Sequence, residues 1–254
     1  MTAPASNMRS LDRSFDLLDV LQAAKQPMKL ADIARRSGLH IATAQRIVNV
    51  LVARGYAARS SDGYTAGPAA LAVAHAYLVS NPLSLLAQPV LQQLATNTGF
   101  TASVYVRVEH SRVLIARVES EHPLSYVLPV GERLPLHVGG AGKIILAGMA
   151  PDERDAALGD IVTVRLADGS SLSRAELEAQ LDQIGEVGYA ISANERLAGI
   201  ASVTAPVRAA DGSLQAVLGV TGSADSINDD TRAGLVAEVR RAADAFGARI
   251  PMQK

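Results

Sequence analysis

The side chains best suited to chemistry in this sequence gather within residues 35–59. A helix predicted to end near Gly55 presents, on the side that its own core does not need, small or hydrogen-bonding side chains and one apolar residue: His40, Ile41, Thr43, Gln45, Arg46 and Asn49. Arginine, glutamine, asparagine and threonine side chains read base edges in the major groove of DNA. Arg35, Arg36 and Arg59 flank this helix and are placed to meet phosphates. The pattern predicts a DNA-binding surface, with an ordinary solvated helix face or a protein-docking winged helix as alternatives.

Three of these residues carry more specific expectations. Arg46 is the predicted base-reading residue. His40 could contact a base or phosphate, or could only begin the helix. Ile41 could touch a thymine methyl group or pack beneath the turn, since the spacing allows both.

Catalytic and metal-binding patterns are absent from the sequence. There is no cysteine, no G-x-S-x-G elbow, and no metal spacing among the five histidines. The segment HVGGAGKII fails the phosphate-loop pattern at His137 and Ile144. Its glycines indicate either a tight strand-to-helix joint or a helix start whose amides face an anion such as a carboxylate. We therefore expect no enzyme, metal or cofactor, and keep an acid-binding sensor-enzyme as an alternative.

A three-helix unit followed by a hairpin is predicted to position the basic residues. The first helix, 10–24, begins at Ser10, and its expected buried stripe is Leu11, Phe15, Leu18 and Leu21. A short second helix ends at Gly38, whose turn lets the third helix leave at a steep angle. The third helix has its own buried stripe, Ala44, Ile47, Val48 and Leu51. Two extended pieces around Ser61-Asp62-Gly63 complete a winged helix-turn-helix.

The segment after this unit contains no charged residue from Gly63 to Val106, in a chain with 19% charged residues. Its middle, PAALAVAHAYLVSN, is apolar nearly all round, which is typical of a buried helix. A connecting helix cannot easily bury every face within one chain. We therefore expect it to pack against a second copy, with burial on its own second domain as the alternative.

The remaining residues mix helices and strands without a regular βαβ repeat. Helices are expected over 83–98, from the glycine turn of GGAGKIILAGM, from the capping box at 173–176 through Ile184, and over 228–248. Strands are expected in ASVYVRV, RVLIARVES, LSYVLPV, YAISA, SVTAPVR and LQAVLGVTG, the last two joined across Asp211-Gly212. The fold class is therefore multi-domain α/β, with an α+β second domain.

The chain resembles the IclR family of bacterial transcription regulators from about residue 9 onward. The resemblance rests on LADIARRSGLHIATAQRIVNVLVARGY, LAQPVLQQLATNTGFTASVYV, VGERLPLHVGGAGKIILAGM and ERLAGIASVTAPVRAADGSLQAVLGVTGS. It implies a GAF-like effector-binding domain, dimers often paired into tetramers, and a ligand-switched regulator of a near-palindromic operator. Family members often begin the recognition helix with Pro-Lys-Ser, where this chain has His40-Ile41-Ala42.

The resemblance also implies an effector pocket. Its expected residues are Tyr126, Leu128, Leu134, Gly140, Ala141, Ser192, Ser202, Gly219 and Thr221. Gly219 stands where a regulator of short oxo-acids can carry serine, so its glycine is expected to add room. A carboxylic acid such as a hydroxybenzoate is then favoured over a short oxo-acid. The expected role is a repressor released by this acid, with an activator as the alternative.

Charge and composition supply the remaining expectations. Residues 1–65 hold nine Lys/Arg and five Asp/Glu, whereas the remaining residues hold 15 Lys/Arg and 20 Asp/Glu. A basic N-terminal region therefore precedes an acidic remainder. The expected divisions are a disordered tail (1–8), a winged helix-turn-helix (9–66), a dimerising linker helix (67–81) and an effector-binding domain (82–250). Without cysteine, signal peptide or membrane span, the expected location is cytoplasmic.

Overall fold

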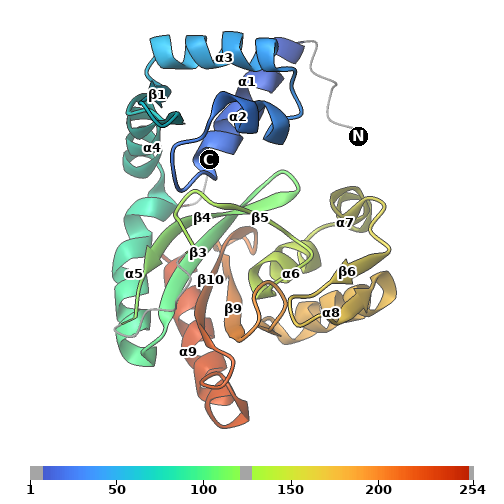
Figure 1. Cartoon of the computed structure of the whole chain (residues 1–254). Coiled ribbons are helices and arrows are strands. Elements are labelled where there is room, and N and C mark those ends of the chain that lie inside the picture. The colour runs from blue at the N-terminus through green and yellow to red at the C-terminus, as the bar shows by residue number, and fades with distance from the viewer. Residues whose placement is uncertain (1–7, 121–127, 252–254) are drawn as a thin grey trace. The chain divides into compact units, whose positions relative to one another are not determined.

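The computed structural model describes residues 8–120 and 128–251 of the chain (Figure 1). The residues form two compact units, Met1–Ser80 and Asn81–Lys254, and each is described by itself. Tyr126, expected at the effector pocket, lies outside the described residues.

The first unit is a winged helix-turn-helix followed by a straight apolar helix, which confirms the predicted fold class. Its elements are α1 (Arg9–Gln22), α2 (Leu30–Arg36), α3 (Ile41–Ala53), β1 (Ala57–Arg59), β2 (Tyr64–Ala66) and α4 (Ala69–Ser80) (Figure 1). Strands β1 and β2 form the antiparallel wing. Gly38, with φ +66°, makes the turn between α2 and α3 in the left-handed conformation that glycine adopts most easily.

The predicted buried stripe of α1 is wrong in its first half. The buried residues of α1 are Leu17 and Leu21, whereas Leu11 and Phe15 are 45% and 56% exposed. Only the second half of α1 contributes to the small core that α2, α3 and β2 share, so among the described residues the first two turns lie outside that core. Ser10 lies inside the helix, where its carbonyl accepts a hydrogen bond from Ser14, and the N-cap is Met8.

Helix α4 covers most of the predicted linker and contains no buried residue. Apolar side chains lie on every side of it, and Leu71 is 71% exposed. Among the described helices none is both long and apolar enough to cross a membrane alone. Only α4 and the following α5 (Pro82–Thr98) together reach that length and composition, and they are bent by 79°.

The second unit is built on one antiparallel sheet. Its six strands run in the order β5-β4-β3-β10-β9-β8, with these bounds: β3 Thr101–Val108, β4 Ser111–Val118, β5 Arg133–Pro135, β8 Ala190–Ala193, β9 Ile200–Arg208 and β10 Leu214–Ser223. Helices α5 and α9 (Asp229–Gly247) pack on one face (Figure 1). The other face meets α6 (Gly140–Ala147), which contacts α8 (Arg174–Val187), so the sheet lies between two layers of helices.

Strand alternation divides the central strands between the two faces. Val104 of β3 and Val203 of β9 lie in the core beneath α5 and α9. Their neighbours, including Ser103, Ser202 and Thr204, face the opposite side. Successive side chains of a strand point to opposite faces, so one apolar face and one more polar face result.

Several predicted elements of this unit are confirmed and others differ. The capping box is present, since Ser173 and Glu176 each accept from the other's backbone amide. The predicted strand LSYVLPV is wrong at 128–130, which form no strand, and its residues 124–127 lie outside the described residues. Sequence patterning did not predict β5, α7 (Pro151–Leu158), β6 (Thr163–Arg165) or β7 (Ser171–Ser173), because each is too short to show a period.

Candidate nucleic-acid interface and ligand pocket

The outer face of α3 places most of the predicted DNA-contacting side chains in solvent. His40, Ile41, Arg46 and Asn49 are exposed, and Thr43 and Gln45 are half-buried. Ile41 is 48% exposed at the start of the helix, so packing beneath the turn does not bury it. His40 is the N-cap residue, and its Nδ1 accepts from the amide of Ala42 at 3.4 Å, a long bond for a cap.

Two side chains of α3 are held by neighbours in the same unit. Gln45 Nε2 donates to Asn49 Oδ1 at 2.8 Å and lies 3.5 Å from the hydroxyl of Tyr64 in the wing. The guanidinium of Arg59 lies over the Tyr64 ring, 5.8 Å from its centre. Tyr64 therefore links the wing arginine to the helix, and a base contact by Gln45 or Asn49 would compete with the bond between them.

The two arginines of α2 are in different environments. Arg35 forms an ion pair with Asp32 at 2.8 Å, and this hydrogen bond lowers the pKa of the Asp32 carboxyl. Arg36 is also exposed and no ion pair of its side chain is recorded among the described residues. Because the Arg35–Asp32 pair is open to solvent, a phosphate can replace the carboxylate at little cost.

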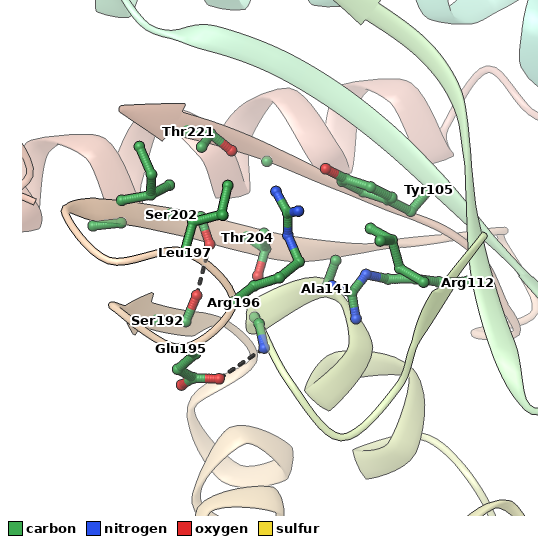
Figure 2. A pocket seen from close by; sticks show the side chains of 16 residues that line it. Tyr105, Arg112, Ala141, Ser192, Glu195, Arg196, Leu197, Ser202, Thr204 and Thr221 are labelled. Atoms are coloured by element: carbon green, nitrogen blue, oxygen red, sulfur yellow. Dashed lines mark hydrogen bonds between the residues drawn. The ribbon is translucent and has the colours of Figure 1, made fainter. Parts of the chain in front are cut away.

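A pocket in the second unit collects most of the predicted effector-binding residues (Figure 2). The predicted residues that line it are Leu134, Gly140, Ala141, Ser192, Ser202, Gly219 and Thr221. Leu128 lies in an adjoining hollow that shares Thr221 with this pocket. Further lining residues that the sequence analysis did not predict are Tyr105, Arg112, Gly139, Glu195, Arg196, Leu197, Ile200, Ala201 and Thr204.

The most informative of the unpredicted residues is Arg112, on β4. It is 3% exposed, and its Nη1 donates to the carbonyls of Pro135 and, at 2.7 Å, Val138. Burial lowers its pKa to about 10, so the guanidinium remains charged at neutral pH. Its Nε has no hydrogen-bond partner among the described residues. The sequence signal that could have found it is an arginine at the start of an apolar strand.

The recorded contacts of Arg112 are with neutral groups. Both of its hydrogen-bond acceptors are carbonyl oxygens, and its guanidinium lies 5.8 Å from the centre of the Tyr105 ring. The carboxylate of Glu195 favours the charge of Arg112 from nearby, but it is bound to Lys143 and no ion pair between it and Arg112 is recorded among the described residues, so the cost of burying the guanidinium is only partly offset. An anion entering the pocket beside Arg112 would remove that cost, which makes this end of the pocket suited to a carboxylate.

The start of α6 already holds a carboxylate from the protein itself. Glu195 accepts from the amide of Gly139 at 2.7 Å and from the ammonium of Lys143 at 2.5 Å. Lys143 also donates to Gln180 at 2.7 Å. The glycine turn does face an anion, but that anion is Glu195, which ties the β8–β9 loop to α6. Arg112 is therefore a better binding partner for a ligand carboxylate than the amide of Gly139, which Glu195 already occupies.

Three hydroxyl side chains supply neutral polar groups to the same pocket. Ser192 and Ser202 face each other across β8 and β9, with their hydroxyls 2.9 Å apart (Figure 2). Thr221 lies opposite Ser202 on β10. Such a set can bind a hydroxyl or carboxyl oxygen without adding charge.

The expectation that Gly219 adds room to the pocket is wrong. A Cβ atom at this position would lie 2.4 Å from Cγ2 of Thr204 and 2.6 Å from the carbonyl oxygen of Val203. A Cβ at Gly140 would likewise meet the Thr204 hydroxyl at 2.5 Å. The two glycines leave room for the side chain of Thr204. The space that a side chain at Gly219 would take is therefore filled by Thr204 and does not enlarge the pocket.

Gly219→Ala is expected to destabilise the second unit by about 1–3 kcal/mol, because the added methyl group overpacks a site bounded by backbone. Urea unfolding measures the change. Gly185→Ala, in α8, is the matched control, since a Cβ there meets nothing within 4 Å and alanine favours a helix. Equal stability of the two variants would contradict the close packing around Thr204.

Groups of three or more His, Asp or Glu side chains able to hold a metal ion are absent from the residues that the structure describes. The polar groups of the pocket are thus arginines, hydroxyls and one engaged carboxylate. Groups of these kinds are suited to binding an organic anion.

Comparison with known proteins agrees with both parts of the chain. The IclR helix-turn-helix domain matches residues 10–61, and the IclR C-terminal domain of bacterial transcriptional regulators matches residues 75–248. The regulator BhcR of Paracoccus denitrificans is 29% identical over 89% of this chain and 81% of its own length. The repressor AllR of Escherichia coli is 25% identical over 87% of this chain and 83% of its own.

Solved structures share the fold. The IclR homologue from Microbacterium hydrocarbonoxydans, complexed with 4-hydroxybenzoate, is 21% identical, covers 94% of this chain and 98% of its own, and has a TM-score of 0.76. The helix-turn-helix model and the C-terminal model together account for the two units seen in the structure. The chain belongs to the IclR family of bacterial transcriptional regulators, which bind DNA and respond to a ligand.

Proposed function

We propose that this regulator represses a catabolic operon and that a small carboxylic acid releases it from its operator. The buried guanidinium of Arg112 carries the proposal, because it lines the pocket and its hydrogen-bond partners are neutral carbonyls. An acid that binds one arrangement of the protein more tightly shifts the population toward it. The name of the repressor AllR supports repression over activation.

An aromatic acid of the hydroxybenzoate kind fits the pocket better than a short oxo-acid. Leu134, Leu197 and Ile200 give apolar walls for a ring, and the Ser192–Ser202 pair can accept or donate to a ring hydroxyl. The Microbacterium homologue bound to 4-hydroxybenzoate supports the same class. The proposed contacts are Leu128, Leu134, Gly140, Ala141, Ser192, Ser202, Gly219 and Thr221, with Arg112 added.

Two copies are proposed to pair through α4, as a homodimer or a dimer of dimers. The support is that α4 is apolar on every side and buries none of its residues in one chain. Residues 9–66 would then form the DNA-binding domain, 67–81 the dimerising linker and 82–250 the effector-binding domain, after a tail of 1–8. A symmetric pair of recognition helices suits a near-palindromic operator with half-sites about one helical turn or a multiple apart.

The proposed DNA contacts divide into base-reading and phosphate-binding groups. The base-reading group is His40, Ile41, Thr43, Gln45, Arg46 and Asn49 on α3, and the phosphate-binding group is Arg35, Arg36 and Arg59. Arg46 is the strongest candidate of the first group, because it is exposed in the middle of α3 and has no ion pair recorded among the described residues.

Arg46→Ala is expected to weaken operator binding by roughly 1–3 kcal/mol and to relax the preference at one base position. The matched comparison is Arg36→Ala, which should weaken binding to all sequences alike and reduce the salt dependence. Titrations against an operator and its single-base variants measure both. A uniform loss with Arg46→Ala would make Arg46 a phosphate contact.

The test of the whole proposal is a binding titration of the purified protein. DNA from just upstream of its own gene and the neighbouring gene is compared with a scrambled duplex at low and moderate salt. A repressor holds one natural fragment at moderate salt and loses it when an aromatic acid or short oxo-acid is added. Equal loss of both fragments with salt alone would show phosphate attraction only.

A further inference from the structure

The ligand pocket adjoins a second hollow on the same face of the sheet. The two share Tyr105, Arg196, Leu197, Ile200 and Thr221. Arg112 lines only the first of them and Arg117 lines only the second. Taken together they form one continuous lining, with Arg112 in one part and Arg117 in the other.

Arg117 is the second buried arginine of this face. Its side chain is 8% exposed, and Nη1 donates to the carbonyl of Leu128 at 3.0 Å. Its Nε is buried and has no hydrogen-bond partner among the described residues. Arg112 has the same unsatisfied Nε. Two buried guanidinium groups, each lacking one acceptor, therefore lie along one strand.

A bulge in β4 places both arginines on the pocket face. Arg112 pairs with Arg107 and Arg117 pairs with Ser103, but the register shifts between them so that Ile115 has no partner on β3. Without the extra residue, side chains five positions apart would point to opposite faces. Their partners on β3, Arg107 and Ser103, are four residues apart, so the two arginines start from positions separated by about 13 Å along the strand.

The residues that line both hollows are three with apolar surface, one hydroxyl residue, Thr221, and one further arginine, Arg196. Tyr105, Leu197 and Ile200 line both hollows. The carboxylate of Glu195, at the edge of the first hollow, already binds Lys143 and the amide of Gly139. The two hollows thus share apolar walls and Arg196, whereas Arg112 lines only the first hollow and Arg117 only the second.

We propose that the effector is a dicarboxylate, with one carboxylate bound by Arg112 and the other by Arg117, and an aromatic or aliphatic spacer against Tyr105, Leu197 and Ile200. This inference rests on the proposed function, since it names the charge of the acid that the regulator senses. It makes Arg117 a residue that selects diacids over monoacids. An acid with one carboxylate would leave Arg117 with only the exposed carboxylate of Glu119 as its recorded ion-pair partner among the described residues.

Glu119 also pairs with Arg117 and would compete with a ligand carboxylate. Its carboxylate lies 3.1 Å from Nη2 of Arg117, but the Glu119 side chain is 48% exposed. An ion pair with one partner in solvent contributes little, so a ligand carboxylate can replace Glu119 or take the free Nε beside it.

The test compares matched acids by calorimetry on the full-length protein. Benzene-1,4-dicarboxylate is paired with 4-hydroxybenzoate, and hexanedioate with hexanoate, so that each pair differs at one end. The expected result is that at least one diacid binds 10-fold or more tighter than its monoacid. In Arg117→Gln the ratio of diacid affinity to monoacid affinity is expected to fall to about one. In Arg117→Lys the preference for the diacid is expected to be partly restored. Arg208→Gln, an exposed arginine of β9, controls for loss of a positive charge.

Each outcome bears on the proposal. A preference that survives Arg117→Gln, or monoacids that bind as tightly as diacids and release DNA, overturns the dicarboxylate inference and leaves the acid-sensing function intact. Binding of neither kind overturns both. Thermal unfolding of each variant identifies a folding defect, and Arg117→Lys then decides, because it keeps the buried charge.

Discussion

Arg112→Met is expected to leave a protein that binds its operator but is no longer released by the acid. The substitution keeps an unbranched side chain about as long as the stem of arginine and removes the buried charge that lines the pocket. Truncating one partner of a buried, hydrogen-bonded charge pair costs 2–5 kcal/mol, so the acid should bind about 100-fold more weakly. Calorimetry gives the affinity, and a DNA titration with and without the acid gives the response.

Stability must be measured beside affinity, because Arg112 also binds two buried carbonyls. Removing the donor leaves the oxygens of Pro135 and Val138 short of a partner, which costs about 1–3 kcal/mol. Arg112→Lys separates the two effects, since it keeps the charge but cannot reach both carbonyls in the same way. Arg208→Met is the control on the same sheet. Full release of DNA from Arg112→Met by the acid would contradict the assignment.

Leu71→Glu is expected to give monomers that lose specific DNA binding. Leu71 is 71% exposed on a helix with no buried residue, so the charge does not disturb the fold of one chain. At the proposed interface it would place two desolvated carboxylates near each other, which is strongly unfavourable. Linking two binding modules raises overall affinity by 10²–10⁴, and the same factor is lost when the pair separates.

Light scattering gives the mass of the variant, and a titration against the palindromic operator gives its affinity. Val162→Glu is the matched control, because Val162 is 75% exposed and belongs to the second unit. It should change neither quantity. An intact dimer in Leu71→Glu would exclude α4 as the contact between copies.

The sequence by itself was sufficient for the elements with a long period or a strong local signal. The helix-turn-helix follows from an apolar stripe on α3 and a left-handed Gly38, and the capping box at Ser173 and Glu176 marks the start of α8. The β9–β10 hairpin follows from its turn at Asp211-Gly212. These signals depend on neighbours within a few residues, so no tertiary information is needed to interpret them.

The position of α1 in its core could not be obtained in that way. Leu11 and Phe15 belong to the same helical stripe as Leu21, yet only Leu17 and Leu21 are buried, since the core shared with α2, α3 and the wing takes in residues from the second half of α1 alone. A periodic pattern shows which face is apolar. It does not show how much of that face has something to pack against.

The chemistry of the pocket was decided by tertiary structure alone. Arg112 and Arg117 come to one face through a bulge at Ile115, and Glu195 reaches the start of α6 from a loop more than fifty residues later in the chain. Thr204 fills the space of two glycines on different elements. The sequence determined which residues form the reading helix and the apolar connecting helix; packing between distant strands determined which charges the ligand meets, because burial and pairing depend on neighbours in space.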